Sequence, residues 1–147
     1  MSKTRVCIVC FANYCRSPVA EAIINSKYED EVIATSAGIH PLPQAGMDRR
    51  SSEFLKSINV LSKIHNPKKL TKDIVNLSDL VLAVDFNILL TLNKSNIVPQ
   101  KKLKMLNFMT PKIQLPDPYR MDIEEYFNVM KNINKVCENI IPRELLS

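Results

Sequence analysis

The hydrophobic positions of this chain alternate between short continuous runs and segments with helical spacing. The run at 80–84 is apolar throughout and that at 4–9 is apolar from Val6 onward, which is typical of strands buried on both faces of a sheet. Shorter strands are predicted at 31–35 and 103–108. Between the strands, apolar residues recur three or four positions apart, as on the buried face of a helix. The predicted helices span 17–28, 48–58, 86–92 and 123–141.

Strands that alternate with helices in this order predict one α/β domain over residues 1–147. Its four strands would form a parallel sheet, and right-handed crossovers would place helices on both faces, giving three layers. Ligands in such folds bind at the carboxyl ends of the strands. The segment that follows the first strand, residues 10–18, is therefore the first candidate for a functional site.

Residues 10–18 combine a cysteine, an arginine and the start of a helix. Five residues separate Cys10 from Arg16, enough for the loop to curl so that its backbone N–H groups surround an anion. The helix N-terminus adds partial positive charge, and the Arg16 guanidinium suits two phosphate oxygens. The same field favours the Cys10 thiolate. The segment thus predicts a phosphate-binding loop after the first strand, with a nucleophile at its floor.

A simpler interpretation is that these cysteines are small buried residues. It suits Cys7 inside the strand, but it fits Cys10 poorly, because strand end, arginine spacing and helix start coincide there. Cys7 and Cys10 also have a zinc-like C-x-x-C spacing. No second pair follows, and neither His40 nor His65 stands at a ligand-like interval, so we expect no metal and no other cofactor.

Composition changes this picture little. The net charge of +5 comes from lysines spread along the chain, without an arginine-rich stripe or stacking aromatics. We therefore expect no nucleic-acid partner, only a modest attraction for anionic substrates. No apolar run is long enough to cross a bilayer or to form a signal-peptide core. We expect a cytoplasmic protein without membrane insertion, as a monomer or weak dimer.

The segment C-F-A-N-Y-C-R-S-P at 10–18 resembles the signature loop of the low-molecular-weight protein tyrosine phosphatases, and the likeness runs nearly the whole chain. Thr-Ser-Ala-Gly at 35–38 resembles the family's loop after its second strand. Residues 78–82, followed by Asp85, resemble its third strand, and L-P-D-P-Y at 115–119 resembles its general-acid loop. The resemblance implies a cysteine-dependent protein-tyrosine phosphatase.

The mechanism implied by this resemblance needs no metal. Cys10 attacks phosphorus and forms a phosphocysteine, while Arg16 and the loop amides hold the oxygens. Asp117 protonates the departing phenolate and then acts as base toward water. The Ser17 hydroxyl helps the cysteine leave in the second step. The loop residues that would supply the amides are Phe11, Ala12, Asn13, Tyr14 and Cys15.

The resemblance also implies a network of Asn13, Ser36 and His65 that fixes the shape of the loop. An asparagine in the left-handed conformation is plausible on backbone grounds alone. The alternative for His65 is an ordinary exposed or core histidine. For Asp117 it is a turn aspartate before proline, which would be a weak signal without Cys10.

Four positions depart from the family pattern. Ala12 replaces a usual loop glycine, which narrows the allowed backbone angles. Tyr14 replaces isoleucine, or the threonine of relatives that act on phosphoarginine, and its bulk argues against that substrate and adds an aromatic wall. The family's aromatic after S-A-G is missing, with Leu42 the nearest large apolar residue. Arg120 replaces the second tyrosine of D-P-Y-Y.

D-P-Y-R together with Leu42 resembles the bacterial subgroup that acts opposite tyrosine autokinases of capsule and exopolysaccharide export. This resemblance implies a phosphotyrosine protein as partner, such as an autokinase with a tyrosine-rich tail. Tyr119 would stack on the substrate ring. Arg120 would meet a second phosphate or an acidic neighbour, unless it is simply a solvated surface residue.

Cys15 indicates a redox role, since it could capture an oxidised Cys10 as a reversible disulfide. Two other functions stay open. A thiol-dependent arsenate reductase would share loop and fold, but only Cys137 follows Cys15 to serve a relay. A non-catalytic phosphate-binding module is the other, and the joint presence of Cys10, Arg16 and Asp117 argues against it.

Overall fold

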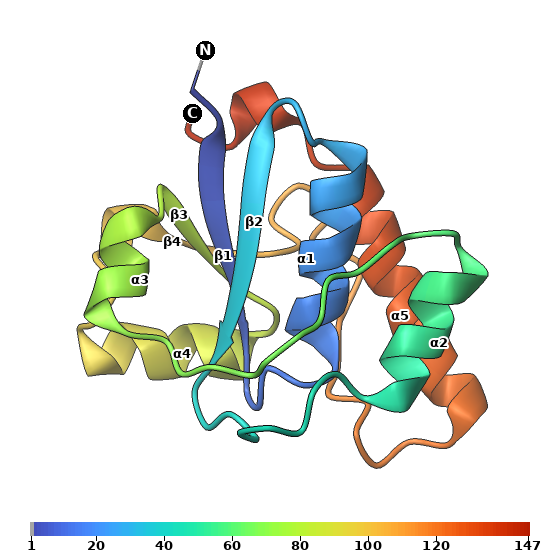
Figure 1. The fold of residues 1–147 in the computed structure, drawn as a ribbon. Helices are drawn as coiled ribbons and strands as arrows, with labels where there is room; N and C mark the ends of the chain where they lie inside the picture. The colour runs from blue at the N-terminus through green and yellow to red at the C-terminus, as the bar shows by residue number, and fades with distance from the viewer. Residues whose placement is uncertain (1) are drawn as a thin grey trace.

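The computed structural model describes residues 2–147, which form a parallel sheet between two layers of helices (Figure 1). In this part of the chain the four strands stand in the order β2-β1-β3-β4. Helices α1, α2 and α5 cover one face and α3 and α4 the other, so the predicted three-layer α/β architecture is confirmed. The strands are β1 (Thr4–Cys10), β2 (Val32–Gly38), β3 (Leu80–Ala83) and β4 (Leu103–Met105). The helices are α1 (Arg16–Lys27), α2 (Arg49–Ser57), α3 (Lys72–Leu77), α4 (Phe86–Ser95), α5 (Ile123–Glu138) and the 3-10 turns η1 (Gln100–Lys102) and η2 (Pro142–Glu144).

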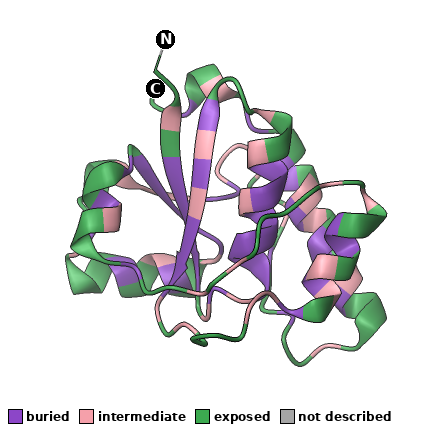
Figure 2. Cartoon of the chain, in the orientation of Figure 1, coloured by how far each residue is buried: buried purple, intermediate pink, exposed green. Residues whose placement is uncertain are grey.

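β1 is the centre of the sheet, and its last five residues are all buried. It pairs with β2 on one side, where Cys10 lies opposite Gly38, and with β3 on the other, where Val9 lies opposite Ala83. Buried positions fill the second half of β1, alternate with intermediate ones in the first part of β2, and cover the facing side of α1 (Figure 2). Burying a side chain such as Ile8 contributes about 1.5–3 kcal/mol, so this core holds the end of β1 firmly in place.

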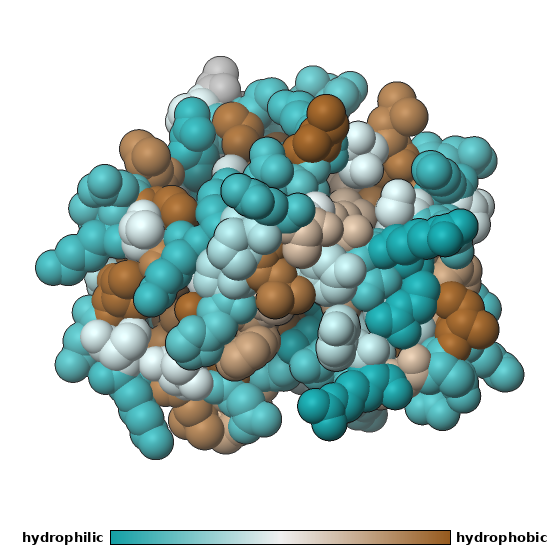
Figure 3. All heavy atoms as spheres, turned by 60° about the horizontal axis from the view of Figure 1, so that its bottom comes forward, coloured by the Kyte–Doolittle hydropathy of each residue, from teal (hydrophilic) through white to brown (hydrophobic). Residues whose placement is uncertain are grey.

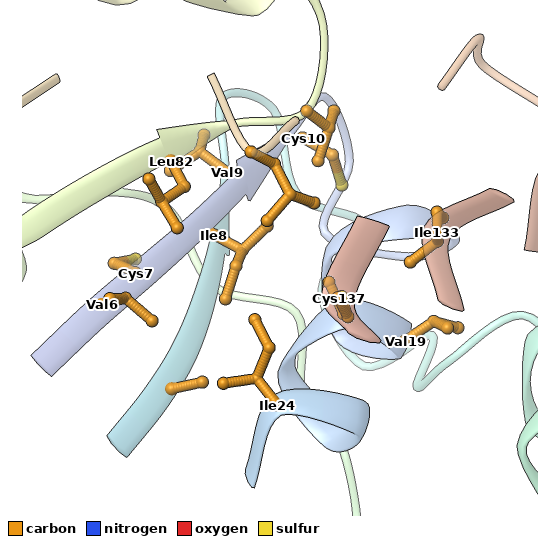
Figure 4. Close-up of a cluster of buried hydrophobic side chains, with 14 of the residues drawn as sticks. Val6, Cys7, Ile8, Val9, Cys10, Val19, Ile24, Leu82, Ile133 and Cys137 are labelled. Atoms are coloured by element: carbon orange, nitrogen blue, oxygen red, sulfur yellow. The ribbon is translucent and has the colours of Figure 1, made fainter. Parts of the chain in front are cut away.

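The core on the helical side joins β1 to α1 and α5. Figure 4 shows Ile8 in one buried cluster with Val19 and Ile24 of α1 and Ile133 and Cys137 of α5. Residues 16–20 of α1, its first turn and a little beyond, are entirely buried. The beginning of α1 is thereby fixed relative to the end of β1, and the loop between them has two rigid anchors.

Several predicted boundaries were wrong. β2 extends to Gly38, so the T-S-A-G segment forms the end of the strand and not a loop after it. β4 stops at Met105 because the chain turns from residue 106 onward. α5 ends at Glu138 and not at residue 141, and the apolar Ile123 at its start is exposed. Helix α3 was not predicted at all, since it is short and buries only Val75.

Within residues 2–147, no helix combines the length and the apolar character that crossing a membrane requires.

Candidate active site

The loop between β1 and α1, residues 10–16 and hereafter the phosphate loop, presents the nucleophile. Cys10 is buried, and its Sγ lies 2.9 Å from Oγ of Ser17 on the first turn of α1. In the described chain no side chain caps the N-terminus of α1. The first N–H groups of the helix therefore remain for an anion, which the helix dipole also attracts.

Asn13 organises the loop from inside. Its φ of 53° is left-handed, and the side chain is completely buried. The amide nitrogen donates to Oγ of both Ser17 and Ser36, each at 2.9 Å, and Oδ1 accepts from the backbone N–H of Lys68 at 3.0 Å. Because all these partners are fixed, the side chain of Asn13 holds the strained backbone in a single shape.

The structure also brings two further side chains, those of Ser36 and His65, into contact with Asn13. Nε2 of His65 lies 2.6 Å from the backbone oxygen of Asn13. The hydroxyl of Ser36 donates to Oε1 of Glu21 at 2.5 Å, which orients its lone pairs toward the asparagine amide. Sequence reasoning missed Glu21, although its place one turn into α1 is consistent with a contact to the loop.

Gly38 allows the phosphate loop to lie directly on the end of β2. A Cβ atom at this position would stand 2.8 Å from the nitrogen of Asn13 and 2.9 Å from the oxygen of Phe11. Both are backbone atoms that cannot swing away. The glycine of S-A-G is therefore required by this close approach.

Ala12 creates no such conflict. Among the described residues of the phosphate loop, positive φ occurs at Asn13 and not at Ala12. The backbone conformation at residue 12 is therefore one that alanine adopts without strain.

Arg16 is anchored before any ligand arrives. Its guanidinium is buried, and one terminal nitrogen donates to Oδ2 of Asp85 at 2.6 Å and to the backbone oxygen of Leu115 at 2.8 Å. Asp85 is itself fixed, because its other oxygen caps α4 at the N–H of Ile88. Since both bonds use the same nitrogen, the remaining donors of the planar fork are available to an oxyanion.

The resemblance to the family's third strand included Asp85, but the sequence alone indicated no role for this residue. Its place two residues after β3, at the carboxyl end of a central strand and the start of α4, is the signal that could have identified it.

A pocket of about 320 Å³ opens above Cys10 and Arg16. The phosphate loop forms its floor. One wall comes from His40 and Leu42 after β2, the other from Asp117, Tyr119 and Arg120. A larger pocket of about 680 Å³ lies beside α1. None of the residues that line the first pocket lines this one, so it is a separate pocket and lacks the nucleophile Cys10. Figure 3 turns this end of the sheet forward and shows hydrophobic side chains among hydrophilic ones on that face.

Aromatic side chains line the pocket on both sides. The rings of Tyr14 and Tyr119 meet edge to face with centroids 6.2 Å apart, and the ring of Phe11 lies against that of His40 with centroids 5.3 Å apart. Residues 115–121, hereafter the acid loop, place Asp117 at the solvent-exposed rim, where its Oδ1 accepts from the N–H of Tyr119 at 3.1 Å. The pocket can thus enclose a flat ring between its buried thiol and an exposed carboxyl.

Cys15 lies close to the nucleophile, but in a different environment. Burial raises the pKa of its thiol to about 12, and the sulfur faces Oδ2 of Asp48 at 3.8 Å. All four cysteines of the described chain are free thiols. Cys15 is therefore held in the neutral form at physiological pH.

Comparison with known proteins agrees with this geometry. The model of the low molecular weight phosphotyrosine protein phosphatase family matches residues 5–146. Etp, a low molecular weight protein-tyrosine-phosphatase of Escherichia coli K12, is 27% identical over 135 residues, which covers 90% of this chain and 89% of Etp.

Solved structures share the fold. Wzb of Vibrio vulnificus, in complex with benzylphosphonate, has a TM-score of 0.84 at 24% identity and covers 93% of this chain and 96% of its own. The YwlE arginine phosphatase of Geobacillus stearothermophilus has a TM-score of 0.84 at 22% identity, with 92% and 89% covered. Because the family model matches almost the whole chain, this protein belongs to the low molecular weight phosphotyrosine protein phosphatases.

Proposed function

We propose that this chain hydrolyses protein phosphotyrosine through a phosphocysteine intermediate on Cys10. The observation that carries the proposal is the 2.9 Å contact between Cys10 Sγ and Ser17 Oγ, at the floor of a pocket whose rim holds Asp117. A hydroxyl in this place donates to the thiolate and so stabilises it both before attack and on departure.

The first step forms the Sγ–P bond and breaks the bond from phosphorus to the phenolic oxygen. Asp117 gives its proton to the phenolate as it leaves. Arg16 and the amides of the phosphate loop hold the three equatorial oxygens, and these bonds strengthen as charge redistributes in the transition state. Asp85 and Leu115 keep the guanidinium in place, so little reorganisation is needed at that moment.

In the second step water attacks phosphorus on the side that the phenol has vacated. Asp117 now takes the proton from water, the S–P bond breaks, and Cys10 leaves as a thiolate that accepts from Ser17. Phosphate and the starting enzyme are the products.

The aromatic walls support phosphotyrosine as the substrate. The pair Tyr14 and Tyr119 offers ring edges and faces to a phenyl group, and Tyr14 is bulkier than the threonine of the relatives that act on phosphoarginine. The fold alone does not distinguish phosphotyrosine from phosphoarginine as the substrate, since an arginine phosphatase shares this fold. The aromatic side chains of the pocket are what favours phosphotyrosine in this proposal.

We further propose that the protein partner is a cytoplasmic tyrosine-rich tail, such as that of a tyrosine autokinase. Arg120 is exposed at the rim of the pocket, and the chain carries a net charge of +5. A second phosphate or an acidic residue beside the target tyrosine would pair with this cation.

Cys15 gives the site a route to reversible oxidation. Peroxide would convert the Cys10 thiolate to a sulfenic acid, and attack by Cys15 would form the Cys10–Cys15 disulfide and release water. The raised pKa of Cys15, about 12, makes this second step slow. Two free thiols fewer in peroxide-inactivated enzyme, regained with reductant, support the disulfide, and an unchanged thiol count contradicts it.

The test of the function is hydrolysis of phosphotyrosine, phosphoserine and phosphoarginine peptides by wild type, Cys10→Ser and Asp117→Asn, with chelator and reductant present. We expect turnover of phosphotyrosine alone. Cys10→Ser should bind the peptide without turning it over, and Asp117→Asn should be about 100-fold slower or more. Absence of turnover by wild type rejects the proposal and leaves arsenate reduction or phosphate binding to be measured.

A further inference from the structure

Arg50, on the first turn of α2, lies outside the pocket but is connected to the segments on both sides of it, directly to the acid loop and through Asp48 to the phosphate loop. Its Nε and one terminal nitrogen donate to the two carboxylate oxygens of Asp48, at 3.1 and 2.9 Å. This is a bidentate pair, the arrangement that fixes an arginine most firmly. Asp48 is the N-cap of α2 and is almost fully buried, so the pair has a rigid base.

The other side of the guanidinium holds the acid loop. Arg50 donates to the backbone oxygens of Tyr119 and Met121, each at 3.1 Å, and its Cζ lies 4.0 Å from the ring centre of Tyr126. The N–H of Tyr119 in turn donates to Oδ1 of Asp117. Only one residue therefore separates Arg50 from the carboxyl that serves as the acid.

Asp48 connects the same ion pair to the phosphate loop. Its N–H donates to the backbone oxygen of Tyr14 at 3.0 Å, and Cys15 Sγ lies 3.8 Å from its Oδ2. One residue further along α2, the hydroxyl of Ser51 donates to the backbone oxygen of Cys15 at 2.9 Å. The start of α2 thus touches the back of the phosphate loop and, through Arg50, the back of the acid loop.

The negative charge of Asp48 is stabilised by Arg50. Burial alone would raise the pKa of the Asp48 carboxyl, but the hydrogen bonds and the positive charge of Arg50 hold it below its ordinary value. Asp48 is therefore ionised throughout the neutral range, and the pair persists wherever the enzyme would work.

We propose that Arg50 is a positioning residue that holds the acid loop in register with the phosphate loop and so fixes where Asp117 meets the leaving oxygen. The proposal rests on the proposed function, because it requires Asp117 to be the proton donor. A purely structural Arg50 would stabilise α2 and its surroundings without acting on proton transfer in particular. In the positioning role, the decrease in kcat/KM on removing Arg50 depends on the leaving group of the substrate. In the structural role it does not.

The experiment compares Arg50→Met with a matched control, Arg49→Met. Both arginines lie in the first turn of α2, but the Arg49 side chain is 92% exposed and pairs with the surface residue Glu53, at 3.2 Å. For each variant, kcat/KM is measured with a phosphotyrosine peptide and with 2,4-dinitrophenyl phosphate. The second leaving group is too weak a base to need protonation, so it reports the phosphate loop without the acid.

We expect Arg50→Met to lower kcat/KM for phosphotyrosine about tenfold or more, as a small misplacement of a catalytic group can. For dinitrophenyl phosphate the change should stay below about twofold, and Arg49→Met should change neither. In an Asp117→Asn background, Arg50→Met should cause no further loss with phosphotyrosine, because the group that it positions is gone.

Equal losses on both substrates, or a full additional loss in the Asp117→Asn background, would overturn the positioning role. Thermal unfolding is followed alongside, and Arg50→Lys serves if Arg50→Met does not fold. That variant keeps the charge but cannot reach Asp48 and two carbonyls together, so the same dependence on the leaving group is expected. If wild type fails on phosphotyrosine, or Asp117→Asn leaves its rate unchanged, the proposed function itself fails.

Discussion

At the scale of single residues, the site depends on side chains whose own surroundings are already fixed. Asn13 bonds Ser17 and Ser36, and Arg16 is held by Asp85. A ligand entering the pocket would therefore meet donors that need not rearrange, and binding would retain more of its interaction energy. Two consequences can be measured at individual residues.

The first concerns Ser17. Replacing it with alanine removes the donor to the Cys10 sulfur, a bond to a charged group worth about 1.5–3 kcal/mol, so breakdown of the phosphocysteine should slow about 10- to 100-fold. Stopped-flow measurement with p-nitrophenyl phosphate should then show a burst of phenol followed by slow turnover. Ser26→Ala, on an exposed turn of the same helix, is the control and should behave as wild type. An unchanged kcat in Ser17→Ala would refute the role.

The second concerns Tyr14. Tyr14→Thr removes the ring that meets Tyr119 edge to face, a contact worth about 0.5–1.5 kcal/mol. The ratio of kcat/KM for phosphotyrosine over phosphoarginine peptides should fall about tenfold, partly because the opened wall admits the guanidinium. Tyr14→Phe keeps the ring and should keep the preference. If the ratio in Tyr14→Thr equals that of wild type, Tyr14 does not set the specificity.

At the scale of elements, the position of the phosphate loop is set by the end of β1 and the start of α1, which hold its two ends, and by the end of β2, on which it lies. Gly38 closes β2 at the point where the loop backbone passes. The close approach leaves no room for a side chain at residue 38. The backbone of Phe11 and Asn13 therefore lies directly against the end of β2, which fixes its position.

Gly38→Ala should therefore damage both stability and activity. Its Cβ would meet backbone atoms at 2.8 and 2.9 Å, and such overpacking costs about 1–3 kcal/mol. Activity should fall at least about tenfold because the displaced atoms belong to the phosphate loop. Urea unfolding and phosphotyrosine turnover measure the two effects.

Gly46→Ala is the matched comparison. Gly46 has a φ of +71°, so alanine costs about 1–2 kcal/mol there, but its Cβ would have only an ordinary contact at 3.9 Å. Stability should fall while activity is kept. Equal losses of activity in the two variants would show that the close approach at Gly38 has no special effect on the loop.

The parts of the fold and of the site that the sequence predicts are those that depend on residues close together in the chain. The continuous apolar runs of β1 and β3 mark strands buried on both faces, and the C-x5-R spacing lies within one loop. Helix α3 carries too few buried residues to show a period. The contacts of Arg16 with Asp85 and of Arg50 with Tyr119 join residues 69 positions apart, and no local pattern records them.

At the scale of the whole molecule, the buried cysteines make the stability sensitive to alkali. Burial raises the pKa of Cys7 from 9.0 to about 11 and that of Cys15 to about 12, and it also raises that of Cys137. In the folded protein these groups stay neutral, whereas in the unfolded chain they release protons above about pH 9. The stabilisation is complete below that pH and is lost as the pH rises toward the folded values.

The free energy of unfolding should therefore fall above about pH 9, by up to about 1.4 kcal/mol per pH unit for each thiol. Urea titrations between about pH 7 and 10, with reductant, measure the slope. Cys7→Ala is the informative variant: it is less stable at neutral pH, but its slope should be shallower than that of wild type. Parallel slopes would mean that Cys7 ionises as easily folded as unfolded.

The measurement that tests the central claim most directly is capture of the phosphorylated enzyme. Ser17→Ala is mixed with a phosphotyrosine peptide, quenched within one turnover, digested, and mapped by mass spectrometry. We predict one phosphoryl group on the fragment that contains Cys10, attached to its sulfur, and none in a Cys10→Ala variant. Phosphotyrosine hydrolysis that proceeds without phosphate on Cys10, or with phosphate on another residue, would contradict the account.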